Sequence, residues 1–390
     1  MTTTFKIAMR LLLAMAVTVS AQAQDWSRDG VLSFDTRKVL GKLESALEVH
    51  DELPTLEESR LIGRDQKSAG RELEKIIRES MELFESESIN GLRTQYRRLE
   101  ERIATEKDNI TKFRKERVLA SRDDRSLRTK LMPGDTLKSF VAVTKADFDM
   151  LIEAAENNIE GYEEEKARTI TDMSNALGVI GVELSGDQLE ALMSSVTGDD
   201  VVSMSVVFNA IKDMTTQLAE LTQESGEDLA YAKKYYGMVV ILHRIIGTMQ
   251  EQFVAEIDDR YLPKLQEYRG TANSNIKESR ALLAGGANAE TMRNNIRSNE
   301  MTIQVINLYE KMLKGQRAKV NEALKVTEKE IRVANNTYNT VSLSSAVVSM
   351  IRQGANTFEQ LISLQMPDVQ EFQNEQVREE FRNLTARMGL

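Results

Sequence analysis

The sequence contains no cysteine, and three other residue types are scarce: its 390 residues include four prolines, two histidines and one tryptophan. Without cysteine the chain can form neither a disulfide framework nor a thiolate metal site. Two histidines are too few for a three-histidine zinc site. Aromatic residues are 5% and charged residues 29% of the chain, which together with so little proline favours long helices over a β-sandwich or barrel. The sequence therefore predicts an all-α protein and indicates no cofactor.

The first 23 residues have the pattern of a secretory signal peptide. Lys6 and Arg10 precede an apolar run of about ten residues, and Ala21-Gln22-Ala23 has the small-x-small form of a cleavage site. Such a run is too short for a bilayer span, which needs roughly 20 residues. An uncleaved N-terminal anchor is the alternative. Cleavage would remove both basic residues and change the net charge from −10 to −12.

No later segment is apolar over the length of a membrane span. The most apolar stretches, 201–211 and 236–246, are each near 11 residues long. We therefore expect a soluble mature protein in the periplasm of a bacterium, or outside the cell.

Residues 24–55 carry apolar side chains at helical spacing, and this N-terminal helical segment should stop near Pro54. Residues 56–130 are predicted to form one helix, which would be about 110 Å long at 1.5 Å per residue. Its clearest feature is a heptad seam, in which apolar residues alternate three and four positions apart and one glutamate interrupts them. The seam consists of Ile89, Leu92, Tyr96, Leu99, Ile103, Ile110 and Phe113.

Pro133-Gly134 breaks this helix, because proline and glycine interrupt helices more strongly than other residues do. Thr144 and Asp147 then form an N-cap signal three residues apart, and apolar positions follow at helical spacing. We expect a coiled-coil helical hairpin over residues 56–171, with its tip near 131–143.

The remaining chain completes a predicted elongated helical bundle. Residues 172–284 form a more globular helical subdomain, because their apolar stripes are wider than a heptad seam. Pro263 should bend a helix there without ending it. Beyond Gly285-Gly286 a long returning helix, 285–340, could cover the seam of the 56–130 helix. Amphipathic C-terminal helices are predicted over 341–390, the last of them starting near Asn374.

The familiar motifs of catalysis and of phosphate or metal binding are absent, and we predict no enzyme. Neither His50, expected to be exposed, nor His243, expected to be buried in a core helix, has the neighbours of a nucleophile triad. The densest carboxylate clusters, Glu163-Glu164-Glu165 and Asp258-Asp259, are interpreted as solvated helix faces. A glycosidase would hold two carboxylates in a cleft, usually with aromatic platforms, and this chain has a single tryptophan.

Methionine is common, and four methionines lie on apolar stripes of the middle section. We predict that they are core residues, with an adaptable partner surface as the alternative. They are Met204, Met214, Met238 and Met249.

The acidic chain has a local basic segment at 112–130, with eight basic and three acidic residues. One interpretation is neutralisation by acidic residues on the returning arm, each exposed pair contributing less than about 1 kcal/mol. The other is contact with an anionic lipid or cell-wall surface, where each Lys or Arg gains about 1 kcal/mol. The basic residues are Lys112, Arg114, Lys115, Arg117, Arg122, Arg125, Arg128 and Lys130.

Nucleic acid is a poor partner for an acidic exported chain, and no small-molecule substrate is evident. We therefore expect a non-catalytic structural or adaptor protein of a bacterial cell envelope, which binds other envelope proteins or itself through its helices. The alternative is a secreted, membrane-active helical protein of the pore-forming type, which the short apolar segments 137–143 and 176–182 suggest.

Overall fold

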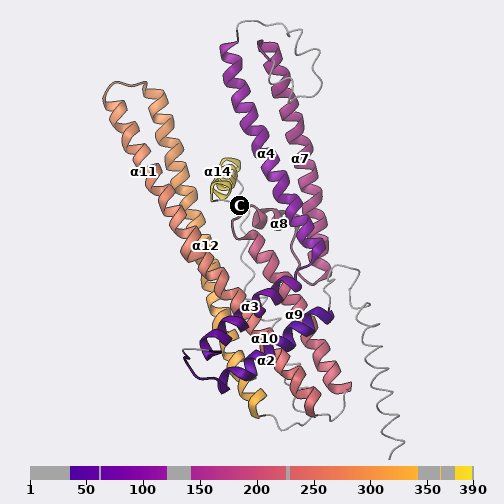
Figure 1. The fold of residues 1–390 in the computed structure, drawn as a ribbon. Coiled ribbons are helices and arrows are strands. Elements are labelled where there is room, and N and C mark those ends of the chain that lie inside the picture. Colours follow the sequence, from indigo (N-terminus) through magenta and orange to yellow (C-terminus); the bar gives the residue numbers. More distant parts are fainter. Residues whose placement is uncertain are drawn as a thin grey trace, which may run out of the picture. The chain divides into compact units, whose positions relative to one another are not determined.

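The computed structural model describes residues 36–60, 63–120, 142–224, 229–340, 361 and 374–388, and within these residues the chain is helical and has no strand (Figure 1). The all-α prediction is confirmed. The chain divides into two compact units. The first contains Met1–Ser86 and Val179–Leu390, and the second contains Glu87–Gly178. The predicted signal peptide, residues 1–23, lies outside the described residues.

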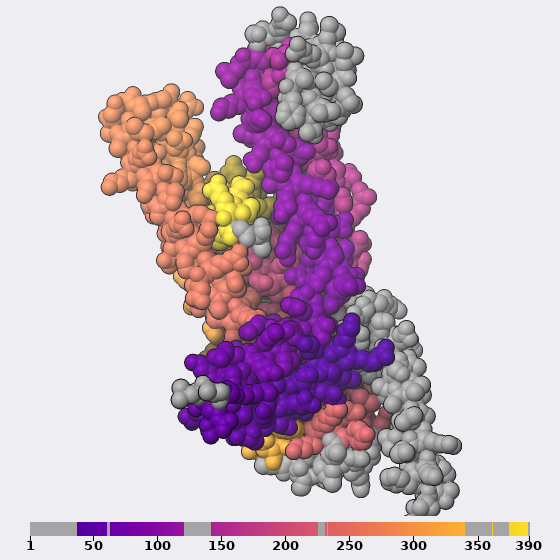
Figure 2. Space-filling view, viewed as in Figure 1, coloured from indigo at the N-terminus to yellow at the C-terminus, as the bar shows by residue number. Residues whose placement is uncertain are grey.

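The first unit begins with two helices, α2 (Thr36–Glu52) and α3 (Gln66–Leu83), which lie side by side on the face shown in Figure 2. As predicted, α2 stops before Pro54, which lies in the short 3-10 turn Leu53–Thr55. The side chain of Asp65 caps α3, because its carboxylate accepts a hydrogen bond from the Ser68 amide at 2.7 Å. Both helices pack against α10 (Leu229–Ala255).

The single helix predicted over 56–130 is wrong. The structure has a break at 84–86, and α4 (Glu87–Leu119) begins after it. The buried stripe of α3 ends at Phe84, whereas the seam of α4 starts at Ile89. In one continuous helix, the next buried residue after Phe84 would be at position 87 or 88. The seam starts at position 89 instead, so the two buried stripes lie on different faces and one straight helix cannot bury both. The predicted hairpin over 56–171 therefore starts at α4, and α3 belongs to the first unit.

The centre of the first unit contains α8 (Gly186–Met193), α9 (Gly198–Glu224) and α10. The four methionines predicted to be core residues, two on α9 and two on α10, are all buried. This core is not confined to 172–284, because α2, α3 and the later helix α12 (Ala289–Thr340) pack on α10 as well. The predicted boundaries of the globular middle section were therefore too narrow.

The helix that contains Pro263 continues through it, as predicted. α10 leads into a π-helical segment, η2 (Glu256–Tyr261), and then into α11 (Leu262–Ala284), where Pro263 lies in the first turn. Proline has no amide hydrogen, and its ring collides with the carbonyl four residues earlier, so a wider π turn accommodates it. α11 stops at Gly285-Gly286, where Gly286 adopts a φ of +90° that suits glycine.

The long helix α12 has 52 residues, which correspond to about 78 Å at 1.5 Å per residue. It packs along α11 and α10. With α11 it forms a helical hairpin across the Gly285-Gly286 turn, and Arg280 of α11 pairs with Glu300 of α12 at 3.4 Å. The sequence left open that this helix covers the seam of the 56–130 helix. In the structure its main partners are α10 and α11.

The C-terminal helix α14 (Glu375–Arg387) starts at Asn374, as predicted, and packs against α12. The Phe381 ring of α14 stacks on the Tyr309 ring of α12, with centroids 4.0 Å apart and planes inclined by 7°. Both side chains are fully or almost fully buried. The remaining predicted helix in 341–373 lies outside the described residues except for Leu361, which is buried.

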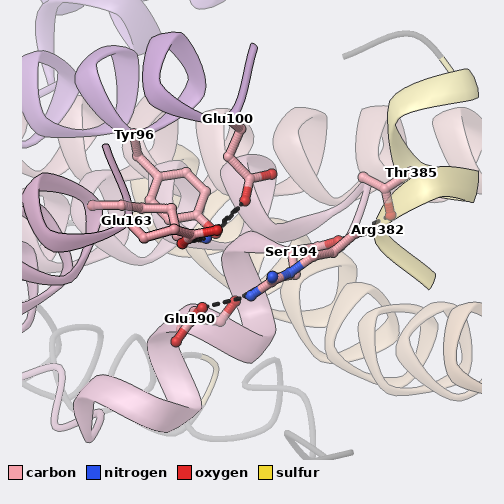
Figure 3. Close-up of polar contacts among 8 residues, drawn as sticks. Tyr96, Glu100, Glu163, Glu190, Ser194, Arg382 and Thr385 are labelled. Atoms are coloured by element: carbon pink, nitrogen blue, oxygen red, sulfur yellow. Dashed lines mark hydrogen bonds and ion pairs between the residues drawn. The ribbon is translucent and has the colours of Figure 1, made fainter. Parts of the chain in front are cut away.

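Polar contacts also fix α14 in place (Figure 3). The Thr385 hydroxyl donates to the Ser194 carbonyl at 2.9 Å. The Arg382 guanidinium pairs with the Glu190 carboxylate of α8 at 2.7 Å. Half-buried ion pairs of this kind add more specificity than stability. α14 is therefore part of the first unit rather than a loosely attached tail.

Within the described residues, no single helix is both long and apolar enough to cross a membrane. α8 and α9 reach that length and hydropathy only as a pair, and the pair is bent by 119°.

Candidate functional site

The second unit is built mainly from α4 and α7 (Lys145–Val179), which run antiparallel. Residues near the start of α4 contact residues in the second half of α7, and residues near the end of α4 contact residues near the start of α7. The side-chain contacts are Gln95 with Glu165 at 2.9 Å, Glu106 with Asn158 at 3.0 Å and Arg117 with Asp149 at 2.5 Å. Most of the predicted tip, 131–143, lies outside the described residues.

The start of α7 confirms the predicted N-cap. The Thr144 hydroxyl accepts from the Asp147 amide at 3.2 Å, and the Asp147 carboxylate accepts from the Thr144 amide at 3.2 Å. Both side chains are buried. The first turn of α7 is therefore held firmly in place.

The predicted seam is buried in this unit. Six of its seven residues are buried, and Leu92 is half-buried. The glutamate that interrupts the seam, Glu106, accepts a hydrogen bond from the Asn158 amide group at 3.0 Å. The described seam residues are thus covered within the chain. The sequence predicted the seam but not which helix packs on it.

A lysine is buried beside the seam, next to Tyr96, Glu100 and Glu163, which Figure 3 labels. Lys166 of α7 is 3% exposed. Its ammonium group lies 2.8 Å from Glu163 and 3.3 Å from Glu100, and 5.8 Å from the ring centroid of Tyr96. Glu100 and Tyr96 are on α4, so sliding of one helix along the other would separate the buried ammonium group from them, whereas Glu163 is on α7 and would move with Lys166. We interpret this cluster as a register contact of the α4–α7 pair.

The predicted basic segment is only partly described. Arg114 pairs with Glu156 at 3.1 Å, and Arg117 pairs with Asp149, so both arginines are neutralised by the returning arm. Lys112 and Lys115 are exposed and make no ion pair within the described residues. The other four basic residues, Arg122, Arg125, Arg128 and Lys130, lie outside the described residues.

The end of the α4–α7 pair exposes large apolar side chains. Leu119 is 81% exposed, Val118 79% and Val143 58%. No other large apolar side chain in the described part of the chain is as exposed. Beneath them Phe113, Phe148 and Leu151 form a small buried core. We call the surface formed by Val118, Leu119, Val143, Lys112 and Lys115 the hairpin end.

The carboxylate clusters have structural partners. Glu163 pairs with Lys166, Glu164 with Arg168 at 3.3 Å, and Glu165 accepts from Gln95. In the first unit, Asp258 pairs with Arg317 of α12. Across the described ranges, no group of three or more histidine, aspartate or glutamate side chains is arranged to hold a metal ion.

The two histidines lie in the first unit. His243 is buried, as predicted, with its Nδ1 2.8 Å from the Val239 carbonyl, and burial lowers its pKa to about 4. His50 is half-buried rather than exposed, because the Tyr338 ring lies beside it with centroids 6.4 Å apart. Burial, followed by the charge of Arg244, lowers the pKa of His50.

Comparison with protein-family models, with curated proteins and with solved structures finds no match for this chain. Its function is therefore inferred from the geometry of the two units. Sequence reasoning missed Val118 and Leu119, because they lie within the basic segment. A usable signal was present: continuing the seam from Phe113 places positions 117 and 120 inward, which leaves 118 and 119 outside.

Proposed function

We propose that this protein is a non-catalytic adaptor of a bacterial cell envelope that binds a partner protein through the hairpin end. The observation that carries the proposal is the clustering of the three most exposed large apolar side chains of the described residues at one end of one helix pair. Apolar patches of this kind on folded proteins are associated with interaction sites.

The helix pair beneath the patch is suited to presenting it. The seam, the buried Lys166 and the Thr144 cap hold the two arms in one register. α4 has 33 residues and so extends about 50 Å at 1.5 Å per residue. This replaces the 110 Å expected from one uninterrupted helix. A rigid arm keeps the entropy cost of ordering low when its end binds a partner.

The charges around the patch favour a protein partner over an anionic surface. Lys112 and Lys115 make no ion pair with the described residues, but Arg114 and Arg117 are already neutralised by carboxylates of α7. An apolar centre surrounded by charges of both signs has the composition of a protein interface. The signal-peptide pattern of residues 1–23 supports an envelope location.

The experiment compares complex formation by variants of the full chain in its native host. Detergent extracts of the envelope are separated on native gels, and the protein is detected by immunoblotting. The wild type is expected in a complex larger than its own mass, and the double variant Val118→Ser and Leu119→Ser is expected to be released from it. Val333→Ser is the control, because Val333 is exposed on α12 in the first unit.

Either of two results would contradict the proposal. One is migration of the wild-type chain at its own mass alone. The other is an unchanged complex in the double variant. Circular dichroism of each purified variant shows whether the fold is retained.

A further inference from the structure

The first unit contains an arginine that has no counterion. Arg244 of α10 is half-buried, and within the described residues it forms neither an ion pair nor a hydrogen bond. Burial lowers its pKa, and no carboxylate opposes that effect. A buried charge is costly unless an opposite charge or hydrogen bonds compensate it. An uncompensated group of this kind in a folded protein calls for an explanation, such as a bound ion.

Three helices meet beside this arginine. A Cβ atom added to Gly237 of α10 would lie 2.7 Å from Leu47 of α2 and 2.9 Å from Tyr338 of α12, so the three helices approach one another closely there. His50 lies one turn beyond Leu47, and Asn335 lies one turn before Tyr338. The rings of His50 and Tyr338 have centroids 6.4 Å apart. This junction therefore holds polar side chains from all three helices.

The side chains of His50 and Asn335 are neighbours of the arginine. Burial, followed by the charge of Arg244, lowers the pKa of His50, whereas Asp51 and the Asn335 side chain raise it, so these groups surround the imidazole. Three buried polar atoms of the junction make no hydrogen bond, namely Nε of Arg244, Nδ1 of His50 and Oδ1 of Asn335. Most buried polar atoms in folded proteins are hydrogen-bonded, so three in one place mark an unusual cluster.

The other nitrogen atoms of the same three side chains remain in contact with solvent. The two terminal nitrogens of Arg244, Nε2 of His50 and Nδ2 of Asn335 are neither fully buried nor hydrogen-bonded to the described residues. A guanidinium group presents its N–H groups as a planar fork that matches a carboxylate, and an amide nitrogen or a neutral imidazole can also donate. The junction thus presents hydrogen-bond donors and a positive charge to an approaching anion.

The charges at the junction favour a ligand with a single negative charge. Asp51 is exposed, and its carboxylate accepts a hydrogen bond from the Tyr338 hydroxyl at 2.7 Å and does not pair with Arg244. Lys233 lies 5.2 Å from the Tyr338 ring centroid and makes no ion pair with the described residues. Two positive charges therefore face one negative charge. A carboxylate balances them, whereas a doubly charged phosphate would exceed the balance.

We infer that a small organic carboxylate binds at the junction of α2, α10 and α12, with its oxygen atoms on the Arg244 guanidinium and on the donors of His50 and Asn335. The junction lies wholly within the first unit, so this site is separate from the hairpin end. The inference adds a ligand class to the proposed adaptor and does not rest on that function.

The test uses three small probes that share a methyl group and differ in charge. They are acetate, neutral acetamide, which has nearly the same shape, and methylphosphonate, which is more negatively charged at pH 8. Each is titrated into the purified full chain at constant ionic strength and followed by saturation-transfer NMR of its methyl signal. Acetate is expected to bind at least about tenfold more tightly than acetamide, because it forms charge-assisted hydrogen bonds. Equal binding of acetate and acetamide, tighter binding of methylphosphonate than of acetate, or no binding of acetate would overturn the inference.

Two variants locate the binding site. Arg244→Met keeps an apolar stem and removes the guanidinium fork, so it should abolish acetate binding; it should still fold, because Arg244 has no counterion to lose. Asn335→Leu removes one donor and should weaken acetate binding about two- to tenfold. The matched control is Arg317→Met, which removes a half-buried arginine that pairs with Asp258 away from the junction. Acetate binding that is unchanged in both junction variants, or that is weakened equally in the control, would overturn the assignment.

Discussion

Tyr309 of α12 contacts both α14 and the segment before α9, and removing its hydroxyl tests how that contact contributes to the fold. The Val196 amide donates to the Tyr309 hydroxyl at 2.7 Å, and that hydroxyl in turn lies 2.8 Å from the Thr385 hydroxyl. Tyr309 and Val196 are both buried. Tyr309→Phe would keep the ring stacked on Phe381 and leave the Val196 amide without its partner.

The expected loss follows from the burial of that amide. A buried donor left without an acceptor costs about 1–3 kcal/mol, because water cannot replace the lost bond. Thr385 keeps its bond to the Ser194 carbonyl, so it adds little to the loss. Tyr309→Phe should therefore lower the free energy of unfolding of the first unit by about 2 kcal/mol. Tyr261→Phe is the matched control, and we expect a change within about 0.5 kcal/mol because its hydroxyl makes no hydrogen bond to the described residues.

The assay is urea unfolding followed by far-ultraviolet circular dichroism, combined with hydrogen exchange of the α14 amides in the full chain. The account predicts a lower unfolding midpoint and faster exchange in α14 for Tyr309→Phe only. Equal stability of the two variants would refute the reasoning. So would a larger loss in Tyr261→Phe than in Tyr309→Phe.

Three further predictions concern other positions. The pKa of His243 is lowered to about 4, so the folded state binds fewer protons than the unfolded state as the pH falls from 6.5 towards 4. The free energy of unfolding should drop by up to about 3 kcal/mol over that window, and urea titrations at fixed pH should show a smaller drop in His243→Asn. Lys166→Met should lower the free energy of unfolding by about 2 kcal/mol; the loss is moderate because its two carboxylate partners are about one-third exposed and stay hydrated without it. Arg168→Met on the solvated face should lower it by less than about 0.5 kcal/mol. Hydrogen exchange of the α7 amides measures both changes. Gly315→Ala should raise the thermal midpoint, since nothing lies within 4 Å of the new methyl group, while Gly237→Ala should lower it, since its Cβ would lie 2.7 Å from a side chain of α2.

Much of the fold could be predicted because local signals coincide with the elements. The capping residues Thr144 and Asn374, the turn at Pro54 and the stop at Gly285-Gly286 all fall where the structure has them. These signals act through backbone groups within a few residues, so they can be read without knowing the tertiary structure. Composition indicated an all-α chain for the same reason.

Tertiary partners were harder to predict. The seam of α4 shows that a helix must cover it, but its spacing is equally compatible with α7 or α12. The break at 84–86 depends on a change in which face of the helix is buried, and that change is visible only when Phe84 and Ile89 are assigned to different cores. The cavity lined by Met81, Asp200 and Tyr261 combines residues of α3, of α9 and of the continuous segment formed by α10 and η2. No periodicity could have placed Met204 beside Tyr261.

The sequence predicted only the general class of the proposed function. High charge, missing motifs and the absence of cysteine favoured an adaptor over an enzyme. The seam and the basic segment were the residues expected to bind partners. The structure assigns the seam to pairing within the chain and shows two of the described arginines neutralised, so the proposed contact surface moves to the hairpin end.

Site-specific photocrosslinking tests the central claim most directly. A benzophenone amino acid replaces Leu119 at the hairpin end, or Val333 on α12 as the control, and the cells are irradiated before the envelope is isolated. The account predicts a discrete protein adduct from position 119, identifiable by mass spectrometry, and none of that mass from position 333. The absence of an adduct at 119, or the same adducts from both positions, would contradict it.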